Sequence, residues 1–314
     1  MTRYVIGRIA QAALVVWAAF TVSFLLLQAL PGDAIMIKFL NPELGLGPDE
    51  VQALREAYGV DQPLLVQYLQ ALGNFLTGDF GYSVQAGVPV SHALWVNLPA
   101  TLRLATLGLA FAAVLAVALA FLSTLSPFVW LRAVIQAAPG LFVSIPVFWL
   151  GIMLIQIFSF RLKWISVINP GEFEGLILPV LTLAVPISAP LAQILMRNID
   201  EVLTQPFVAV ARAKGASPAG VLWRHVAKNA LLPTMTMAGV LFGELLAGAV
   251  ITETVFGLSG IGSLTEQSVR FQDSSVIQAV VVFSAVCFVG VNLIVDLLYP
   301  VFDPRLRKQK VAAA

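Results

Sequence analysis

Residues 207–233, with the sequence FVAVARAKGASPAGVLWRHVAKNALLP, form a long polar segment that separates two membrane-length apolar runs and has a helical pattern of its own. Pro206 suits the first position of a helix, and Gly215 stands where a residue in a left-handed conformation ends one. Ser217 is a natural N-cap for a second helix, and Pro218 follows at its first position. We therefore predict two short helices that fold about Gly215.

The predicted helix pair is basic, and its small residues allow another backbone to approach closely. The second helix should run through His225 toward Asn229. Basic side chains occur at positions 212, 214, 224 and 228, and alanines occur at positions 209, 211 and 213. A compact basic element of this kind fits a groove on a partner protein. The alternative is a basic loop that is only solvated.

The composition of the whole chain indicates a membrane protein. Of its 314 residues, 59% are hydrophobic and 11% are charged, which is too little polar surface to cover a soluble globule of this size. A net charge of +1 argues against a nucleic-acid partner, which would require a concentrated basic face. Cys287 is the single cysteine, and neither His92 nor His225 has a cluster of metal-ligating residues beside it in the sequence. We predict neither an internal disulfide nor a metal site.

Six apolar stretches are long enough to cross a membrane, which takes about 20 residues. They cover about residues 9–30, 101–125, 133–160, 176–196, 231–252 and 276–301. Backbone polar groups in lipid must be satisfied within their own segment, so each stretch should be a helix. Interior prolines at positions 139, 146, 179, 186 and 190 should bend the third and fourth spans. The predicted fold class is an all-α membrane protein with six transmembrane helices.

The distribution of basic residues predicts the orientation of these spans. With the N-terminus inside, the inner side receives Arg3, Arg8, Arg132, Arg197, Arg212, Lys214, Arg224, Lys228, Arg305, Arg307, Lys308 and Lys310. The outer side then receives Lys38, Arg55, Arg103, Arg161, Lys163 and Arg270. Because cytoplasmic loops carry the excess of Lys and Arg, both termini and the helix pair should face the cytoplasm. Arg103 should extend from the second span to the outer surface.

The segment 31–97 is too polar to enter lipid and too long to be an idle link. We predict two helices in it, one over residues 48–59 and one that begins at Pro63. The leucines at positions 65, 69, 72 and 76 of the second helix should pack inward. The simplest interpretation of the segment is that it only caps the spans.

The order of residues in the helix pair resembles the cytoplasmic "EAA" loop of ABC importer permeases. The phrases ARAKGAS and RHVAKNALLP are similar to the first permease subunit of the peptide and nickel importer family. Further family phrases are PGD at 31–33, GVDQP at 59–63, GDFGYS at 78–83, LPATLRLA at 98–105, ITETVFGLSGIG at 251–262 and DPRLRK at 303–308. Three departures occur: the motif positions fall on residues 209–211 without an acidic residue, Gly215 stands farther from Pro233 than in sugar-type permeases, and Ser259 replaces a usual proline.

The resemblance implies a type I ABC importer permease fold and a set of partners. The chain would comprise an N-terminal helix (1–30), an external segment (31–97), a core (98–303) with a coupling loop (206–230), and a cytoplasmic tail (304–314). It would pair with a second homologous permease and with two ABC ATPase subunits that bind ATP and Mg. An external solute-binding protein, received with help from the segment 31–97, would deliver the solute at a bacterial inner membrane.

The resemblance also implies roles for residues of the coupling loop. Ala211, Ala213 and Gly215 would pack closely against a cleft of the ATPase, while Arg212 and Lys214 would contact its rim. His225 lies in the same loop.

Three acidic residues lie in or beside the predicted spans. Glu244 and Asp296 lie deep within spans five and six, where a carboxylate costs about 2.5 to 3.5 kcal/mol on insertion scales. Glu253 lies at the outer end of span five, in the phrase that resembles the family's outer gate. These residues either line the solute pathway or its gate, or hold helices together through hydrogen bonds.

Sequence motifs separate the possible classes of function. The chain has no G-x-x-x-x-G-K-[ST] phosphate-binding loop, so ATP hydrolysis would come from another subunit. The alternative class is an ATP-independent secondary transporter, which would more often show repeated halves. An intramembrane enzyme would need a paired nucleophile and base within the spans. We expect di- or oligopeptides as the solute, with nickel or a metal chelate as the alternative, and the resemblance extends to glutathione importers.

Overall fold

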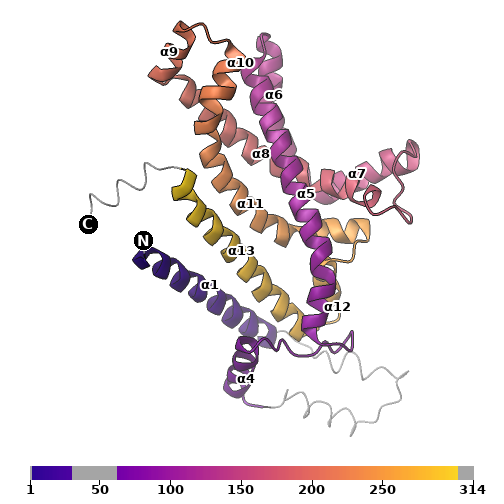
Figure 1. Cartoon of the computed structure of the whole chain (residues 1–314). Helices are drawn as coiled ribbons and strands as arrows, with labels where there is room; N and C mark the ends of the chain where they lie inside the picture. Colours follow the sequence, from indigo (N-terminus) through magenta and orange to yellow (C-terminus); the bar gives the residue numbers. More distant parts are fainter. Residues whose placement is uncertain (1, 30–61, 303–314) are drawn as a thin grey trace. The chain divides into compact units, whose positions relative to one another are not determined.

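The computed structural model describes residues 2–29 and 62–302, which are mainly helical (Figure 1). The α-helices are α1 (Thr2–Ala29), α4 (Leu64–Leu76), α5 (Val90–Leu125), α6 (Val129–Ser144), α7 (Val147–Leu154), α8 (Glu174–Leu203), α9 (Pro206–Ala213), α10 (Pro218–Val221), α11 (Ala227–Phe256), α12 (Ile261–Arg270) and α13 (Ser274–Phe302). Two π-helical segments, η2 (Ile155–Arg161) and η3 (Leu222–Val226), interrupt this order. The described residues contain no β-strand, and the all-α prediction is confirmed. The helix predicted over 48–59 and the tail 304–314 lie outside the described residues.

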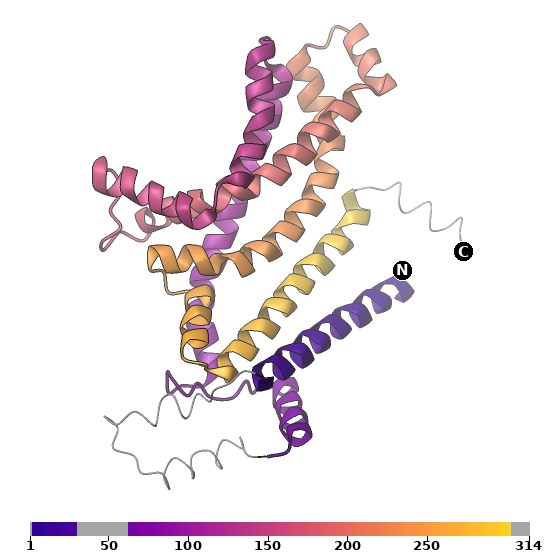
Figure 2. The same cartoon turned by 180° about the vertical axis from the view of Figure 1, so that it is seen from behind.

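The helices form two compact units, which we describe separately. The first unit comprises the described residues within 1–101 and 257–289, and the second comprises those within 102–256 and 290–314. Helices α5 and α13 therefore each contribute to both units. Figure 2 shows the same helices from behind.

In the first unit, aromatic side chains join α4 to α1. Phe20 and Phe24 are buried, and the ring centroid of Phe20 lies 5.8 Å from that of Tyr68 and 5.4 Å from that of Phe75. The prediction that the leucines of α4 pack inward is wrong at three positions, because the side chains at positions 65, 69 and 76 are exposed. The aromatic residues supply a larger contact area with α1 and occupy the inward face instead.

The family phrase GDFGYS forms a turn that leads into α5. Gly78 and Gly81 have φ angles of +84° and +79°, a region that favours glycine. The Asp79 carboxylate accepts a hydrogen bond from the Gly81 N–H at 2.9 Å. Ser83 donates its hydroxyl to the carboxylate of Asp273 at 2.6 Å. This contact fixes the entry to α5 against the entry to α13.

In the second unit, α8 contacts α6, α7 and α11. Small residues let the helices approach closely, as is common between membrane helices. Alanines at positions 112, 116 and 120 of α5 are at most 1% exposed, and they share a core cluster with Ala184, Leu191 and Ala192 of α8. Prolines 179, 186 and 190 lie inside α8, which nevertheless runs from Glu174 to Leu203 as one helix.

The structure contains four helices that are long and apolar enough to cross a membrane, or up to six if each of two bent pairs forms one span. These counts refer to the described residues. α1, α8 and α13 correspond to the predicted first, fourth and sixth spans. α5 begins at Val90 rather than near residue 101, and α12 was not predicted.

The predicted third span is not one continuous helix. α6 and the segment Val147–Arg161 meet at an angle of 101°. Ile145 adopts an extended backbone with φ −86° and ψ 120°, because a residue that precedes proline is disfavoured in the helical region and Pro146 follows it. The sequence interpretation treated this proline as a bend within a span, whereas the helix breaks there.

The predicted fifth span also differs from the structure. α10, η3 and α11 follow one another without a gap, so the second helix of the coupling loop does not end near Asn229. The segments Pro218–Leu231 and Pro233–Leu246 meet at an angle of 52°. The coupling loop is therefore continuous with a membrane helix.

Candidate functional site

The predicted turn at Gly215 is present in the coupling loop, residues 206–230. α9 begins at Pro206 after Gln205, whose backbone is extended. Gly215 has a φ of +84°, and its N–H donates to the Arg212 carbonyl at 2.9 Å. The Ala216 N–H donates to the Ala211 carbonyl at 3.2 Å, which completes a Schellman motif. The left-handed glycine thus reverses the chain after α9.

The predicted N-cap of the second helix is also present. The Ser217 hydroxyl accepts a hydrogen bond from the Gly220 N–H at 3.2 Å, and Pro218 occupies the first helical position. η3 follows directly, where the helix widens to a π-turn. Such turns occur often at functional sites, and residue periodicity did not reveal this one.

The inner face of the coupling loop belongs to the core of the second unit. Val208 and Ala211 of α9 are buried together with Val221, Leu222 and Val226. They share a core cluster with Leu195 and Ile199 of α8 and with alanines of α5. The ring of Trp223 also meets that of Phe121 on α5, at a centroid distance of 4.8 Å. The loop is thus packed directly against two long helices.

The outer face of the coupling loop carries small and basic side chains. Ala213, Lys214, Gly215 and His225 are exposed, as is Arg212. The other exposed side chains of the loop include the small Ala209, the basic Arg224 and Lys228, and the bulky apolar Phe207, Val210 and Trp223. No acidic residue occurs between positions 206 and 230. The loop therefore presents positive charge around the small residues Ala213 and Gly215, and it also exposes bulky apolar side chains.

Ala211 differs from the position that the sequence interpretation gave it. Its side chain is 7% exposed and packs in the core, so it does not belong to the outer face. Helix α9 turns Val208 and Ala211, which are three residues apart, toward the core and leaves Phe207 and Val210 exposed. A contact with a partner at the outer face would therefore involve Ala213 and Gly215 rather than Ala211.

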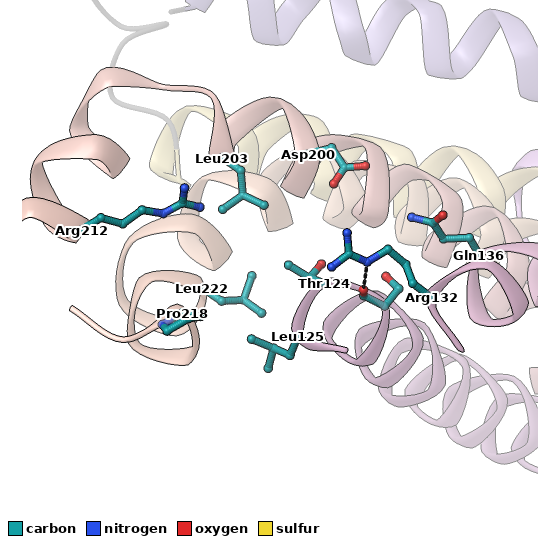
Figure 3. A pocket seen from close by; sticks show the side chains of 10 residues that line it. Thr124, Leu125, Arg132, Gln136, Asp200, Leu203, Arg212, Pro218 and Leu222 are labelled. Atoms are coloured by element: carbon teal, nitrogen blue, oxygen red, sulfur yellow. Dashed lines mark hydrogen bonds between the residues drawn. The ribbon is translucent and has the colours of Figure 1, made fainter. Parts of the chain in front are cut away.

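A pocket of about 260 Å³ lies where the coupling loop meets the membrane helices (Figure 3). It is bounded by the turn between α5 and α6, by the end of α8, and by Arg212, Pro218 and Leu222 of the loop. Arg132 donates from Nε to the Ser123 carbonyl at 3.1 Å and from Nη2 to the Ser126 carbonyl at 3.3 Å. A cation is favourable there because the last carbonyls of a helix lack partners within it. Arg132 thereby fixes the α5–α6 turn beside the loop.

The three candidate pathway acids have different surroundings. Glu244 is exposed on α11, whereas Glu253, farther along the same helix, is fully buried. Asp296 falls in α13 beyond the residues whose side chains the structure describes. Glu244 and Glu253 therefore differ in their surroundings although they lie on the same helix.

The contact of Asp273 with residues 83 and 85 was not predicted from the sequence. Asp273 is 1% exposed and accepts hydrogen bonds from the Ser83 hydroxyl and from the Gln85 N–H, the latter at 3.2 Å. An aspartate directly before a long apolar run was the available signal, but it suggests only a helix cap. Its partners lie about 190 residues earlier in the chain, a separation that no local pattern encodes.

Two family descriptions match almost the whole chain. Residues 112–308 match the family described as the inner membrane component of binding-protein-dependent transport systems. Residues 1–105 match the family described as the N-terminal part of the membrane component of such systems.

Relatives of known name match over nearly their full length. A peptide transport system permease protein of Brucella abortus is 34% identical over 98% of this chain and 99% of its own. The glutathione transport system permease protein GsiC of Escherichia coli K12 is 32% identical over 98% of this chain and 99% of its own.

A solved structure shares the fold. A chain of the MetNI methionine ABC transporter, in an inward-facing conformation, has a TM-score of 0.56 and an identity of 18%. The similarity covers 67% of this chain and 96% of that one. The chain therefore belongs to the multi-pass inner-membrane permeases of binding-protein-dependent ABC importers, which work with ATPase and binding-protein partners.

Proposed function

We propose that the chain forms half of a translocation pathway for di- or oligopeptides. A second homologous permease would supply the other half, and an external binding protein would deliver the solute. Two ATPase subunits would bind ATP and Mg and act on the coupling loop. Support for a peptide solute comes from the names of the relatives, one a peptide permease and the other a permease for glutathione, which is itself a tripeptide.

The proposed orientation places both termini and the coupling loop in the cytoplasm. Its support is the distribution of Lys and Arg along the sequence, which follows the positive-inside rule. We keep the division into residues 1–30, 31–97, 98–303 and 304–314 as part of this proposal.

The proposed mechanism depends on the different surroundings of the two faces of the coupling loop. The exposed basic face around Ala213, Lys214 and Gly215 is free for a partner, while the opposite face is packed into the cluster of α5 and α8. Because packed interiors transmit displacement rather than absorb it, a movement of the outer face would move these helices. The direct continuation of the loop into α11 gives a third route to the membrane spans.

Substitution of Gly215 tests this mechanism. Its φ of +84° is strained for a β-branched residue, although an added Cβ would meet no atom within 4 Å. Gly215→Val should therefore change the backbone at the turn and sharply lower solute-stimulated ATP hydrolysis in the reconstituted importer. Gly215→Asn is the matched control, because asparagine tolerates the left-handed region, and it should keep most of the coupling.

The outcomes of this comparison are distinguishable. Both variants should reach the membrane in normal amount, since the site is exposed and an added Cβ would meet no atom within 4 Å. Coupling that survives equally in both variants would contradict the role of the turn. Solute uptake by this chain alone in ATP-free proteoliposomes would favour the alternative class of secondary transporter.

The solute is tested separately with the cognate binding protein. ATP-dependent uptake of a labelled dipeptide or oligopeptide into proteoliposomes is expected, and unlabelled peptide should compete. Uptake of nickel or a nickel chelate in place of peptide would replace the proposed solute and leave the coupling mechanism untouched.

A further inference from the structure

Helix α4 has three faces of different character, and it contains no charged residue. One face, with Tyr68 and Phe75, contacts α1. A second face is apolar and exposed, with exposed fractions of 68% for Leu65, 58% for Leu69 and 80% for Leu76. A third face carries Gln70 and Asn74, which are also exposed.

Hydrogen bonds between side chains hold α4 against α1. The Trp17 indole N–H donates to the Tyr68 hydroxyl at 3.1 Å, and that hydroxyl lies 2.9 Å from the hydroxyl of Thr21. Gln28 donates from Nε2 to Oε1 of Gln67 at 2.8 Å. Polar side chains that bond across an otherwise apolar contact are typical of helices that meet within a membrane.

The contact lies within the apolar run of α1, whose candidate span covers Ile6–Ala29. Counted from Ile6, where this span begins, Trp17 lies about 17 Å, Phe24 about 27 Å and Gln28 about 33 Å along the helix axis. The hydrocarbon core is about 30 Å thick. α4 therefore contacts α1 from the middle of this span to its C-terminal end, in the leaflet nearer that end, beside which Figure 2 shows it.

The length of α4 suits a position along the membrane surface. Its 13 residues extend about 20 Å, which is too short to cross the bilayer. The span α1 also exposes apolar side chains of its own, because Leu14, Val22 and Leu26 are at least 55% exposed. A helix with one apolar and one polar exposed face lies in the interface, with the apolar face in the acyl chains.

We propose that α4 is an interfacial helix whose leucine face contacts lipid acyl chains in that leaflet. Its Gln70 and Asn74 then face the headgroups and water. The helix belongs to the segment 31–97, which the sequence predicts to lie wholly outside lipid. An uncharged helix fits lipid better than a binding protein, because a transient protein contact normally carries a polar rim.

Spin labels on adjacent residues of α4 test this proposal. Single cysteines are introduced as Leu69→Cys or Gln70→Cys in a Cys287→Ser background, and Leu14→Cys on α1 serves as the lipid reference. Both α4 positions are exposed, so the labels should not disturb folding. The importer is purified from its own membrane with its partners and placed in lipid nanodiscs. Collision of each label is measured with oxygen, which concentrates in acyl chains, and with a water-soluble nickel chelate.

The label at position 69 should collide several-fold more with oxygen, relative to the nickel chelate, than the label at position 70. Its ratio should approach that of the reference on α1. Equal nickel collision at positions 69 and 70 would place the leucine face in water and overturn the proposal. Screening of position 69 from both reagents would overturn it in favour of a protein partner. The measurement needs no transport, so its result is independent of the proposed solute and coupling mechanism.

Discussion

At the scale of single residues, Asp273 joins parts of the chain that are far apart in the sequence. Its side chain is almost fully buried, and one carboxylate oxygen accepts from both Ser83 and Gln85. Hydrogen bonds to a buried charged group stabilise a fold by about 1.5 to 3 kcal/mol each. A buried donor that loses its acceptor costs a comparable amount. Asp273 therefore stabilises the turn before α5 from a position before α13.

We expect Asp273→Ala to lower the stability of the first unit by about 2 to 5 kcal/mol, because it leaves two donors without an acceptor. Ser83→Ala removes the hydroxyl that donates to Asp273 and accepts from the Ala86 N–H, and it should cost about 1 to 3 kcal/mol while Gln85 keeps its bond to the carboxylate. Thermal unfolding in detergent, followed by circular dichroism, measures both shifts. Equal midpoints for Asp273→Ala and the unchanged chain would contradict this role.

Arg103 shows that an exposed ion pair contributes far less to the stability of the fold than a buried hydrogen-bonded group does. Its guanidinium donates to Glu172 at 2.6 Å, and the two side chains are 61% and 68% exposed. Exposed pairs of this kind contribute about 0 to 1 kcal/mol and are screened by salt. The guanidinium thus extends out of α5, and its partner lies just before α8.

At the scale of elements, close approach between helices depends on Gly151 of α7. A Cβ at this position would lie 3.2 Å from the Phe256 ring, 3.3 Å from Val255 and 3.4 Å from the methyl group of Thr182. Gly151 thus brings α7 against both α8 and α11. Gly140 in α6 is a contrast, because an added Cβ would meet nothing within 4 Å.

Gly151→Ala should destabilise the second unit by about 1 to 3 kcal/mol, as is usual when a methyl group is forced into packed surroundings. Gly140→Ala is the matched control and should be neutral or stabilising by up to about 1 kcal/mol, since alanine favours the helix. Denaturation of the two variants in the same detergent compares them directly. A stability loss of equal size in both would show that helix packing at position 151 is not the cause.

The π-helical segment η3 connects the coupling loop to the membrane span that follows it. It places Trp223 against Phe121 while Arg224 and His225 remain exposed. A π-turn inserts an additional residue, so the faces of the helix before and after it are rotated relative to each other. This allows one continuous helix to pack α10 at the loop and α11 along the spans.

At the scale of the whole molecule, the orientation in the membrane decides what each end of the chain can contact. The proposed orientation puts the coupling loop on the cytoplasmic side and the loop between η2 and α8 on the outer side. Lys214 and Lys163 are exposed residues in these two loops. They therefore report on opposite sides of the membrane.

In a Cys287→Ser background, a membrane-impermeant maleimide should label Lys163→Cys but not Lys214→Cys in cells with a permeabilised outer membrane. Inside-out vesicles should give the reverse pattern, because the reagent then reaches only the cytoplasmic face. Mass-shift electrophoresis reads out the labelling. Labelling of Lys214→Cys from the outside would reject the proposed orientation and, with it, the coupling of this loop to cytoplasmic ATPases.

Much of this architecture follows from local sequence patterns. Gly215 and Ser217 predicted the turn and the cap of the coupling loop, because a left-handed turn and an N-cap each depend on a single residue type. The apolar runs predicted three spans well, since the bilayer thickness fixes the length of a spanning helix. The break at Pro146 was not predicted, because a proline permits either a kink or a break and its neighbours in the fold select between them.

The sequence by itself determined the class of the protein. A chain this apolar lies in lipid, where its backbone polar groups find hydrogen-bond partners only within helices. The spacing of glycine, serine and proline determines the turn and the helix starts of the coupling loop. Tertiary structure alone decided which faces of those helices are covered. It buried Ala211 while leaving Ala213 exposed, turned the aromatic rather than the leucine side of α4 toward α1, and brought Asp273 to Ser83. The physical reason is that helical periodicity defines faces, whereas the partner of each face depends on contacts between residues far apart in the chain.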